Sequence, residues 1–245
     1  MDFKGKTILV TGSSRGIGAA TIRKFASLGA DVVINYVSNE DRALELKKEV
    51  EDKYGVEVLA IKCDVSKEEE VIEMFKEIDR VFHRINVVVN NAGIAIDTTF
   101  EDKTVENFKK TIDTNLIGTF LVSKHAIIHL KKEKNSRIIN VASTNGIDTY
   151  YPESLDYDAS KAGVISLTHN FAKVLAPDIN VNAVAPGWVK TEMNKELDEN
   201  DYVNGILMKR FADPMEVANV IVFLASDEAS YINNEVIRVD GGELE

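Results

Sequence analysis

Short runs of β-branched residues alternate along this chain with longer amphipathic stretches. Thr7–Val10, Val32–Ile34 and Val87–Val89 are such runs, and each is followed by a stretch in which apolar residues recur at helical spacing. Uniformly apolar strands are typical of a parallel sheet that is buried on both faces. Right-handed crossovers then give an α/β, doubly wound sheet of about seven strands, with the ligand beyond the carboxyl ends of the strands.

The pattern predicts the bounds of most elements. Ser66 is the expected N-cap of the third helix, and Pro177 and Pro214 end and begin helices. The helix that bears Tyr157 is expected to run to about Leu175. The other predicted helices cover 16–28, 40–54, 67–82, 104–132 and 214–225. The predicted strands are 7–10, 32–34, 56–61, 87–89, 137–142, 179–185 and 235–239.

The chain has no linker, repeat or low-complexity tract, so we expect one domain over residues 1–245. Helical or strand periodicity is weakest over residues 191–212. A long irregular insertion in a compact plan is usually functional, so this segment is the expected substrate-binding loop.

Charge and composition exclude several classes of protein. The net charge is −11, which argues against nucleic acid or an anionic membrane as a main partner. The first ten residues hold only a short apolar run, so we expect neither a signal peptide nor a membrane span. The single cysteine, Cys63, suits a reducing compartment, and we expect a cytoplasmic protein. The four histidines show no metal-ligand spacing, so no metal site is expected.

A tyrosine and a lysine four residues apart indicate acid–base chemistry. Tyr157 and Lys161 share one face of the predicted helix, and Ser143 lies upstream of them. A nearby cation favours the phenolate, so we expect Lys161 to draw the pKa of Tyr157 toward neutrality. Ser143 is placed to hold a substrate oxygen. Taken alone, most tyrosine–lysine pairs at this spacing are solvated helix faces.

A glycine-rich turn joins the first strand to the first helix. Its sequence, Thr11 to Gly18, reads TGSSRGIG, so the glycine spacing is G-x-x-x-G-x-G rather than G-x-G-x-x-G. Glycines here allow a phosphate to approach backbone N–H groups at a helix N-terminus. The alternative is a turn that serves only helix–strand packing.

Taken together, these motifs resemble the short-chain dehydrogenase/reductase family, whose members have a Rossmann fold. The motifs that carry the resemblance occur in the family's order: the TGSSRGIG turn, Asn90–Gly93, Asn115, Ser143, Tyr157 with Lys161, and Pro186-Gly187. The resemblance covers essentially the whole chain. The segments TNLIGTF, YDASKAG, NAVAPGW and VDGG are most similar to bacterial 3-oxoacyl-acyl-carrier-protein reductases.

The resemblance implies a catalytic set. Tyr157 would donate the proton in ketone reduction, and Lys161 would lower the Tyr157 pKa and bind the nicotinamide ribose. Ser143 would hydrogen-bond the substrate carbonyl, and Asn115 would support a water that relays protons to Lys161. The resemblance also implies a cofactor site formed by these two residues together with Gly12, Ser14, Arg15, Gly16, Ile17, Gly18, Tyr36, Asp64, Val65, Asn91, Ala92, Gly93, Pro186, Gly187, Val189 and Thr191.

Charge at the end of the second strand predicts which cofactor is used. A carboxylate there would bind the ribose 2′-OH of NAD and repel the 2′-phosphate of NADP. That place holds residues 35–38, NYVS, and the first acid after it is Glu40. Arg15 in the glycine turn is expected to reach a 2′-phosphate. We therefore expect NADP(H).

The resemblance leaves the substrate open. One expectation is a 3-oxoacyl thioester, with acyl-carrier protein as a possible partner; the other is a sugar, polyol or small cyclic ketone. Members that act on carrier protein tend to have a basic residue after the Leu-Ala of the tyrosine helix, whereas here Pro177-Asp178 follows Leu175-Ala176. A non-catalytic protein on the same fold would be expected to lose Tyr157 or Lys161. The resemblance also implies a homotetramer built on helices 104–132 and 156–175 and the C-terminal strand.

Overall fold

One seven-stranded parallel sheet runs through the computed structural model, which describes residues 1–195 and 197–243. The strand order is β3-β2-β1-β4-β5-β6-β7, and every neighbouring pair is parallel. The fold expected from the sequence is confirmed. The strands are β1 (Thr7–Val10), β2 (Asp31–Tyr36), β3 (Val58–Lys62), β4 (Val87–Asn90), β5 (Ser136–Val141), β6 (Ile179–Pro186) and β7 (Val236–Val239).

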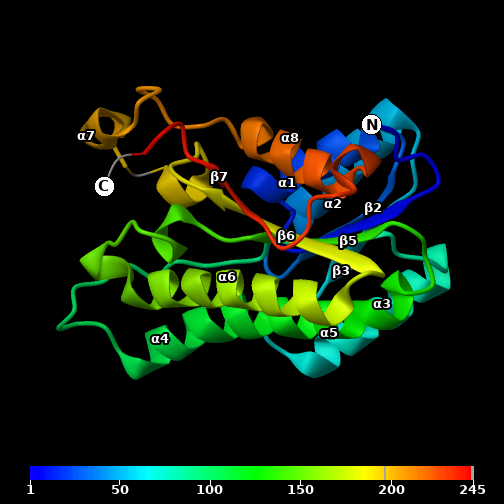
Figure 1. Ribbon diagram of the computed structural model, residues 1–245, viewed down its shortest axis with the longest axis horizontal. Coiled ribbons are helices and arrows are strands. Elements are labelled where there is room, and N and C mark those ends of the chain that lie inside the picture. The colour runs from blue at the N-terminus through cyan, green and yellow to red at the C-terminus, as the bar shows by residue number, and fades with distance from the viewer. Residues whose placement is uncertain (196, 244–245) are drawn as a thin grey trace.

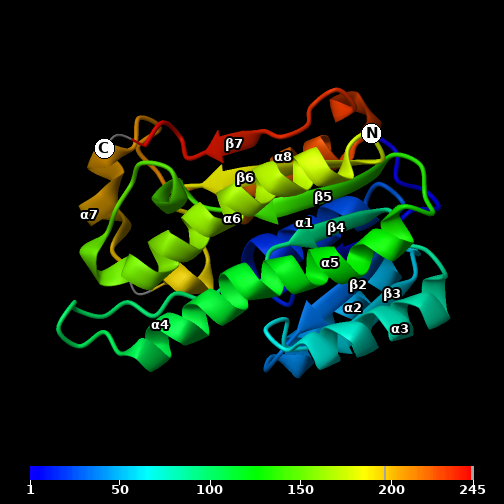
Figure 2. The ribbon, with the colours of Figure 1, turned by 60° about the horizontal axis from the view of Figure 1, so that its bottom comes forward.

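Helices cover both faces of this sheet (Figures 1 and 2). One face carries α1 (Gly16–Ala26), α2 (Glu40–Tyr54) and α8 (Pro214–Ala225), which bury a core with residues such as Ile22, Val50 and Ile221. The other face carries α3 (Glu68–Phe82), α5 (Gly118–Leu130) and α6 (Leu155–Leu175), with a second core that includes Phe75 and Leu130. The uniformly apolar strands contribute to both cores, as their composition predicts.

The strand order reverses direction at the centre of the sheet. The chain moves from β1 outward through β2 to β3, then returns to β4, which pairs with the other edge of β1. The crossovers leave β1 and β4 toward opposite faces, so their carboxyl ends flank a crevice. Ligands of doubly wound sheets bind at this kind of position.

The predicted helix 104–132 is interrupted. It divides into α4 (Val105–Ile112), a π-helical turn (Asp113–Ile117) and α5. Such single π turns are frequent at functional sites, and this one contains Asn115.

The predicted N-cap of the third helix is wrong. Helix α3 starts at Glu68 with Lys67 in the N-cap position, and the Ser66 hydroxyl instead donates to the Asp64 carboxylate at 2.7 Å. The helix begins one residue later than predicted, so Ser66 lies before the N-cap and its hydroxyl orders the preceding turn at Asp64. Other predicted bounds hold: α2 and α8 match closely, and α6 ends at Leu175 before Pro177.

Residues 191–212 are largely irregular, as expected. They contain only the short helices Glu192–Asn194, α7 (Glu199–Tyr202) and Val203–Gly205 among the described residues. Figure 1 shows α7 at the end of the molecule that also carries the C-terminus. In the described part of the chain, no helix has the length and apolar character needed to cross a membrane.

Candidate active site

A cleft of about 450 Å³ opens at the carboxyl ends of the strands. Its volume lies in the range of small-molecule and cofactor sites. The glycine turn after β1 forms one wall, and the turn after β4 lies beside it. The remaining wall comes from the ends of β5 and β6 and from the first turns of α6. Most of the residues singled out from the sequence line this cleft: Gly12, Ser14, Arg15, Gly16, Ile17, Tyr36, Asp64, Val65, Asn91, Ala92, Gly93, Ser143, Tyr157, Lys161, Pro186, Gly187, Val189 and Thr191.

The glycine turn needs its glycines for close approach. Gly12 and Gly16 adopt positive φ angles of 60° and 55°, which only glycine adopts readily. A Cβ on Gly12 would lie 2.8 Å from the Ala92 Cα, and a Cβ on Gly18 would lie 2.7 Å from the Asn91 amide nitrogen. Substitution at either position would therefore push the two turns apart.

The start of α1 is open to an anion. Its N-cap, Arg15, makes no side-chain cap hydrogen bond, and the first turn holds no acidic residue. By contrast, α8 has a capping box between Asp213 and Glu216. The uncapped N–H groups of α1 face the cleft, where the glycines leave space for a phosphate. The residues present therefore fit a dinucleotide.

Hydrogen bonds with the turn after β4 and with β2 hold the glycine turn in place. The Thr11 hydroxyl accepts from the backbone N–H groups of Asn91 and Ala92, both at 3.0 Å. The Asn91 amide donates to the carbonyls of Thr11 and Gly12 at 2.8 and 3.0 Å. Asn35, at the end of β2, accepts from the Gly12 N–H at 3.0 Å. Hydrogen bonds thus fix the backbone at the floor of the cleft in one arrangement, which suits precise placement of a ligand.

Tyr157, Ser143 and Lys161 converge on the cleft. The Lys161 ammonium lies 5.4 Å from the centre of the Tyr157 ring and donates to the Val141 carbonyl at 2.8 Å. The Ser143 hydroxyl, on the loop after β5, lies close enough to the Tyr157 phenol to act on its pKa. Asn145 lies within hydrogen-bond distance of the same hydroxyl, at 3.2 Å. A substrate oxygen placed between Ser143 and Tyr157 would meet two hydroxyl groups.

Burial shifts both titrating groups away from their ordinary values. It raises the pKa of Tyr157 to about 12, although Ser143 acts in the opposite direction. It lowers the pKa of Lys161 to about 8. The sequence-based expectation of a lowered Tyr157 pKa is therefore wrong for this structure, because burial of the phenol raises its pKa and is the largest effect. A neutral phenol is the form that donates a proton.

Asn115 lies behind the cleft wall rather than in it. Its side chain exchanges two hydrogen bonds with the backbone of Ile94, at 2.8 and 2.9 Å, and donates to the Ser160 hydroxyl at 3.0 Å. A Cβ on Gly93 would lie 3.4 Å from the Asn115 oxygen and 3.5 Å from the Lys161 nitrogen. Asn115 and Lys161 thus approach the same glycine, and Asn115 fixes the loop that carries it.

Comparison with known proteins places the chain in one family. The family model described as "Enoyl-(Acyl carrier protein) reductase" matches residues 12–243. A protein of Aquifex aeolicus named 3-oxoacyl-acyl-carrier-protein reductase is 41% identical over 98% of both chains. A protein of Thermotoga maritima with the same name is 40% identical over 99% of both chains. The 3beta-hydroxysteroid dehydrogenase 1 of Eggerthella lenta is 40% identical over 98% of this chain and 94% of its own.

Solved structures agree with the sequence comparison. A short-chain dehydrogenase/reductase from Serratia marcescens superposes with a TM-score of 0.94 at 31% identity, over 99% of both chains. A short-chain dehydrogenase of Burkholderia cenocepacia, solved in complex with NADP, gives the same TM-score at 30% identity over 99% of both chains. The chain belongs to the short-chain dehydrogenase/reductase family.

Two of the residues carried over from this family do not line the cleft. Gly18 packs beneath the glycine turn against Ser13 and Asn91, and Asn115 is buried behind Gly93. Their contacts make them supports of the cleft. Of the other predicted cofactor residues, Asp64 accepts from the Ser66 backbone and hydroxyl and so orders its own turn.

Arg15 does not point freely into the cleft of this short-chain dehydrogenase/reductase. Its guanidinium donates to the Glu192 carboxylate at 2.8 Å. Arg42, in the first turns of α2, bonds to the other oxygen of the same carboxylate. Sequence analysis missed Arg42 and Glu192, because they are far apart in the chain and neither belongs to a motif. The only available signal was that Glu192 directly follows Thr191.

Proposed function

We propose that the protein is an NADP-dependent reductase that converts the ketone of a 3-oxoacyl thioester into a secondary alcohol. The observation that carries the proposal is the convergence of Ser143, Tyr157 and Lys161 on a cleft whose opposite wall is the glycine turn. Relatives of about 40% identity over nearly the whole chain are named for this reaction. Tyr157 and Lys161, the proton donor and the lysine that the family resemblance implies, are both present in the chain.

The proposed roles follow from the chemistry of each side chain. Ser143 donates a hydrogen bond to the carbonyl oxygen and polarises it, and Tyr157 donates the proton that this oxygen gains. Lys161 supplies a desolvated cation beside the phenol and a donor for the cofactor ribose. Asn115 holds the loop of Gly93 against Lys161 and so fixes the part of the cleft wall that lies beside Lys161. In this scheme Tyr157 and Ser143 contact the substrate, whereas Asn115 is a positioning residue.

The cofactor would be held by the residues of the cleft. The glycine turn and the open start of α1 would bind the phosphates, and Asp64, Val65 and Tyr36 would border the adenosine end. When bound, the nicotinamide supplies the hydride for the carbonyl carbon. The neighbouring structure from Burkholderia cenocepacia, solved with NADP, supports this assignment.

We further propose that residues 191–212 form the substrate-binding part of a single domain. Aromatic rings cluster where this segment meets β6: Trp188 lies 4.6 Å from the Tyr202 ring and 5.6 Å from the Phe211 ring, centre to centre. Tyr151 packs on the other side of Trp188 at 5.5 Å. Such a cluster offers an apolar wall to an acyl chain.

A second candidate function is oxidation or reduction of a ring-shaped alcohol or ketone. The Eggerthella lenta relative, named for a steroid substrate, is as similar to this chain as most of the acyl reductases. The aromatic cluster around Trp188 would also suit a flat ring system. The name of the matching family model raises reduction of an enoyl double bond as a third reaction to be tested.

Partners are also proposed rather than known. Chemistry at a thioester makes acyl-carrier protein a candidate partner, and the family resemblance supports a homotetramer. The net charge of −11 is unfavourable to an acidic carrier. A coenzyme A thioester would avoid that repulsion, so both forms of the substrate belong in the test.

The test follows oxidation of NADPH with a panel of substrates: acetoacetyl-CoA, acetoacetyl-acyl-carrier protein, a crotonyl thioester, small diketones, aldoses and a 3-ketosteroid. We expect acetoacetyl thioesters to give the highest kcat/KM. Tyr157→Phe should lower turnover by ~10²-fold or more. Tyr150→Phe is the matched control, because its exposed hydroxyl lies away from Tyr157 chemistry and donates to the Ile147 carbonyl. Preference for the steroid or the crotonyl thioester, or normal turnover in Tyr157→Phe, would overturn the proposal.

A further inference from the structure

Three charged side chains from distant parts of the chain meet at the mouth of the cleft. Glu192 accepts from Arg15 at 2.8 Å through one carboxylate oxygen and from Arg42 through the other. Arg15 is the N-cap of α1, Arg42 lies on α2, and Glu192 begins the short helix after Thr191. The two arginines hold the pKa of Glu192 below its ordinary value, Arg42 contributing most, so the carboxylate stays ionised.

This cluster lies where the sequence predicts the 2′-phosphate of the cofactor. Arg15 and Glu192 line the cleft together with Tyr36, Val37 and Ser38, the residues that end β2. The ribose of the adenosine half binds near the end of β2 in folds of this class. The Glu192 carboxylate therefore occupies the space between two cations at the ribose end of the cleft.

A carboxylate held by two guanidinium groups has the chemistry of a bound phosphate. Arginine forms charge-assisted hydrogen bonds equally with carboxylate and phosphate oxygens. We propose that Glu192 is an internal competitor for the 2′-phosphate, and that Arg15 and Arg42 together bind this phosphate once Glu192 is displaced. The inference rests on the proposed function, because it concerns how the same cleft selects its cofactor. Arg42 then becomes a specificity-determining residue, and Glu192 weakens the preference for the phosphorylated cofactor.

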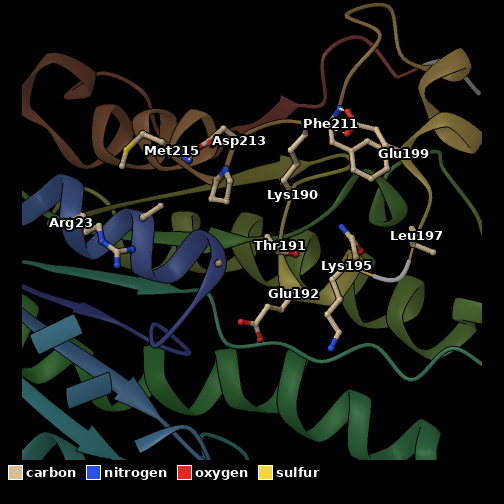
Figure 3. A pocket seen from close by; sticks show the side chains of 14 residues that line it. Arg23, Lys190, Thr191, Glu192, Lys195, Leu197, Glu199, Phe211, Asp213 and Met215 are labelled. Carbon is tan, nitrogen blue, oxygen red and sulfur yellow. Dashed lines mark hydrogen bonds and ion pairs between the residues drawn. The ribbon is translucent and has the colours of Figure 1, made fainter. Parts of the chain in front are cut away.

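Glu192 has space to withdraw. A second cavity of about 620 Å³ lies on the other side of its segment, between α1 and the start of α8. Figure 3 shows that its lining side chains come from three places: Arg23 on α1, side chains of the segment such as Lys190, Glu192, Lys195 and Leu197, and Asp213 and Met215 at the start of α8. Gly16, Thr191, Glu192 and Asn194 line both cavities. The segment is thus a thin partition between the two cavities, with open space on both sides of Glu192.

The test compares two nucleotides that differ only in the phosphate of interest. Binding of 2′,5′-ADP and of 5′-AMP is measured by calorimetry with the full chain. Glu192→Gln keeps the shape but removes the charge, and it should tighten 2′,5′-ADP by about fivefold while leaving 5′-AMP unchanged. Arg42→Met should weaken 2′,5′-ADP by about tenfold, again with little effect on 5′-AMP.

A matched control and a parallel measurement separate the outcomes. Glu77→Gln removes a carboxylate that is paired with Arg80 on α3, far from the cleft, and should change neither affinity. Equal tightening of both nucleotides by Glu192→Gln, or no change in either, would overturn the inference. Failure of the unmodified protein to bind NADP, measured alongside, would instead overturn the proposed function.

Discussion

The Lys161 ammonium lies 5.4 Å from the centre of the Tyr157 ring, and its hydrogen bond goes to the carbonyl of Val141 rather than to the phenol. The pair therefore shares one desolvated space without forming a direct bond. Burial acts on the two groups in opposite directions, raising the pKa of the phenol to about 12 and lowering that of the ammonium to about 8. Near neutral pH the tyrosine is neutral and the lysine is charged. This is the protonation state that ketone reduction requires.

The first prediction is the pH profile of reduction. The profile of kcat/KM reports the pKa values of the free enzyme. It should be flat near neutral pH and fall with a midpoint near the Lys161 pKa of about 8, because the cation beside the phenol is then lost. Ser143→Ala should lower the whole profile by ~10²-fold without moving that midpoint. A profile that stays flat until the ordinary lysine pKa of 10.5 would show that burial does not act as described.

The second prediction concerns stability. The folded-state pKa of Lys161 is lowered from 10.5 to about 8, so below about pH 8 the folded state bears the cost of a buried cation. This cost is relieved as pH rises from 8 toward 10.5, where the unfolded state binds more protons. A shift of this size corresponds to about 3 kcal/mol. A substitution that removes the Lys161 ammonium would gain this free energy, but it would also lose the hydrogen bond to Val141, which offsets about 1 kcal/mol of the gain.

Lys161→Met should therefore stabilise the protein near neutral pH by about 2 kcal/mol, or about 4–8 °C in Tm, while abolishing turnover. Calorimetry provides the measurement. The advantage of the variant should shrink toward about pH 10, because the unmodified protein then no longer buries a charge. A variant that is destabilised equally at both pH values would contradict the argument.

Much of the fold was predictable from the sequence because local patterns determine it. The β-branched runs, the Pro214 start of α8 and the Pro177 stop after α6 are set by residues within a few positions of one another. The glycine turn and the Tyr157–Lys161 spacing likewise placed those residues at the cleft. Features that depend on long-range contacts were not predictable. The Arg15–Glu192 ion pair joins residues 177 positions apart, and no local rule encodes it.

The pKa values of the site residues also could not be predicted from the sequence. Spacing alone suggested that Lys161 lowers the pKa of Tyr157, but the balance depends on how deeply both groups are buried. The Ser66 cap failed because the helix begins one residue later, with Lys67 in the N-cap position, and a boundary of one residue is not encoded by the local pattern. The π turn around Asn115 follows from packing against the Ile94 backbone and has no sequence signature.

The third prediction concerns a buried ion pair beside Tyr157. Lys103 donates to Asp156 at 2.8 Å, and the two side chains are only 5% and 0% exposed. Burial alone would raise the pKa of Asp156, but hydrogen bonds, that of Lys103 the largest, lower it overall. The pair thus stabilises the protein above the ordinary aspartate pKa, and this contribution is lost as pH falls through the lowered value.

Lys103→Met leaves a buried carboxylate without its partner and should destabilise the protein by about 3–5 kcal/mol. The double variant Lys103→Met/Asp156→Leu should recover most of this loss. Lys76→Met, which breaks the exposed pair with Glu73, is the control and should cost less than about 1 kcal/mol. Denaturant unfolding measures all three. Equal costs for the two lysine variants would show that burial does not strengthen the Lys103–Asp156 pair.

The last prediction is a homotetramer whose interfaces use the outer side of α4, α5 and α6. This layer exposes large apolar side chains, among them Val105 and Val174 at 75% and Ile128 at 65%. Exposed apolar residues concentrated on neighbouring helices mark interaction surfaces. Sedimentation at micromolar concentration should give a tetramer, and Ile128→Glu should dissociate it because a buried carboxylate at the interface has no partner. Leu44→Glu, on α2 across the sheet and 47% exposed, should leave the tetramer intact. A monomeric unmodified protein, or equal dissociation by both variants, would contradict this assignment of the interface.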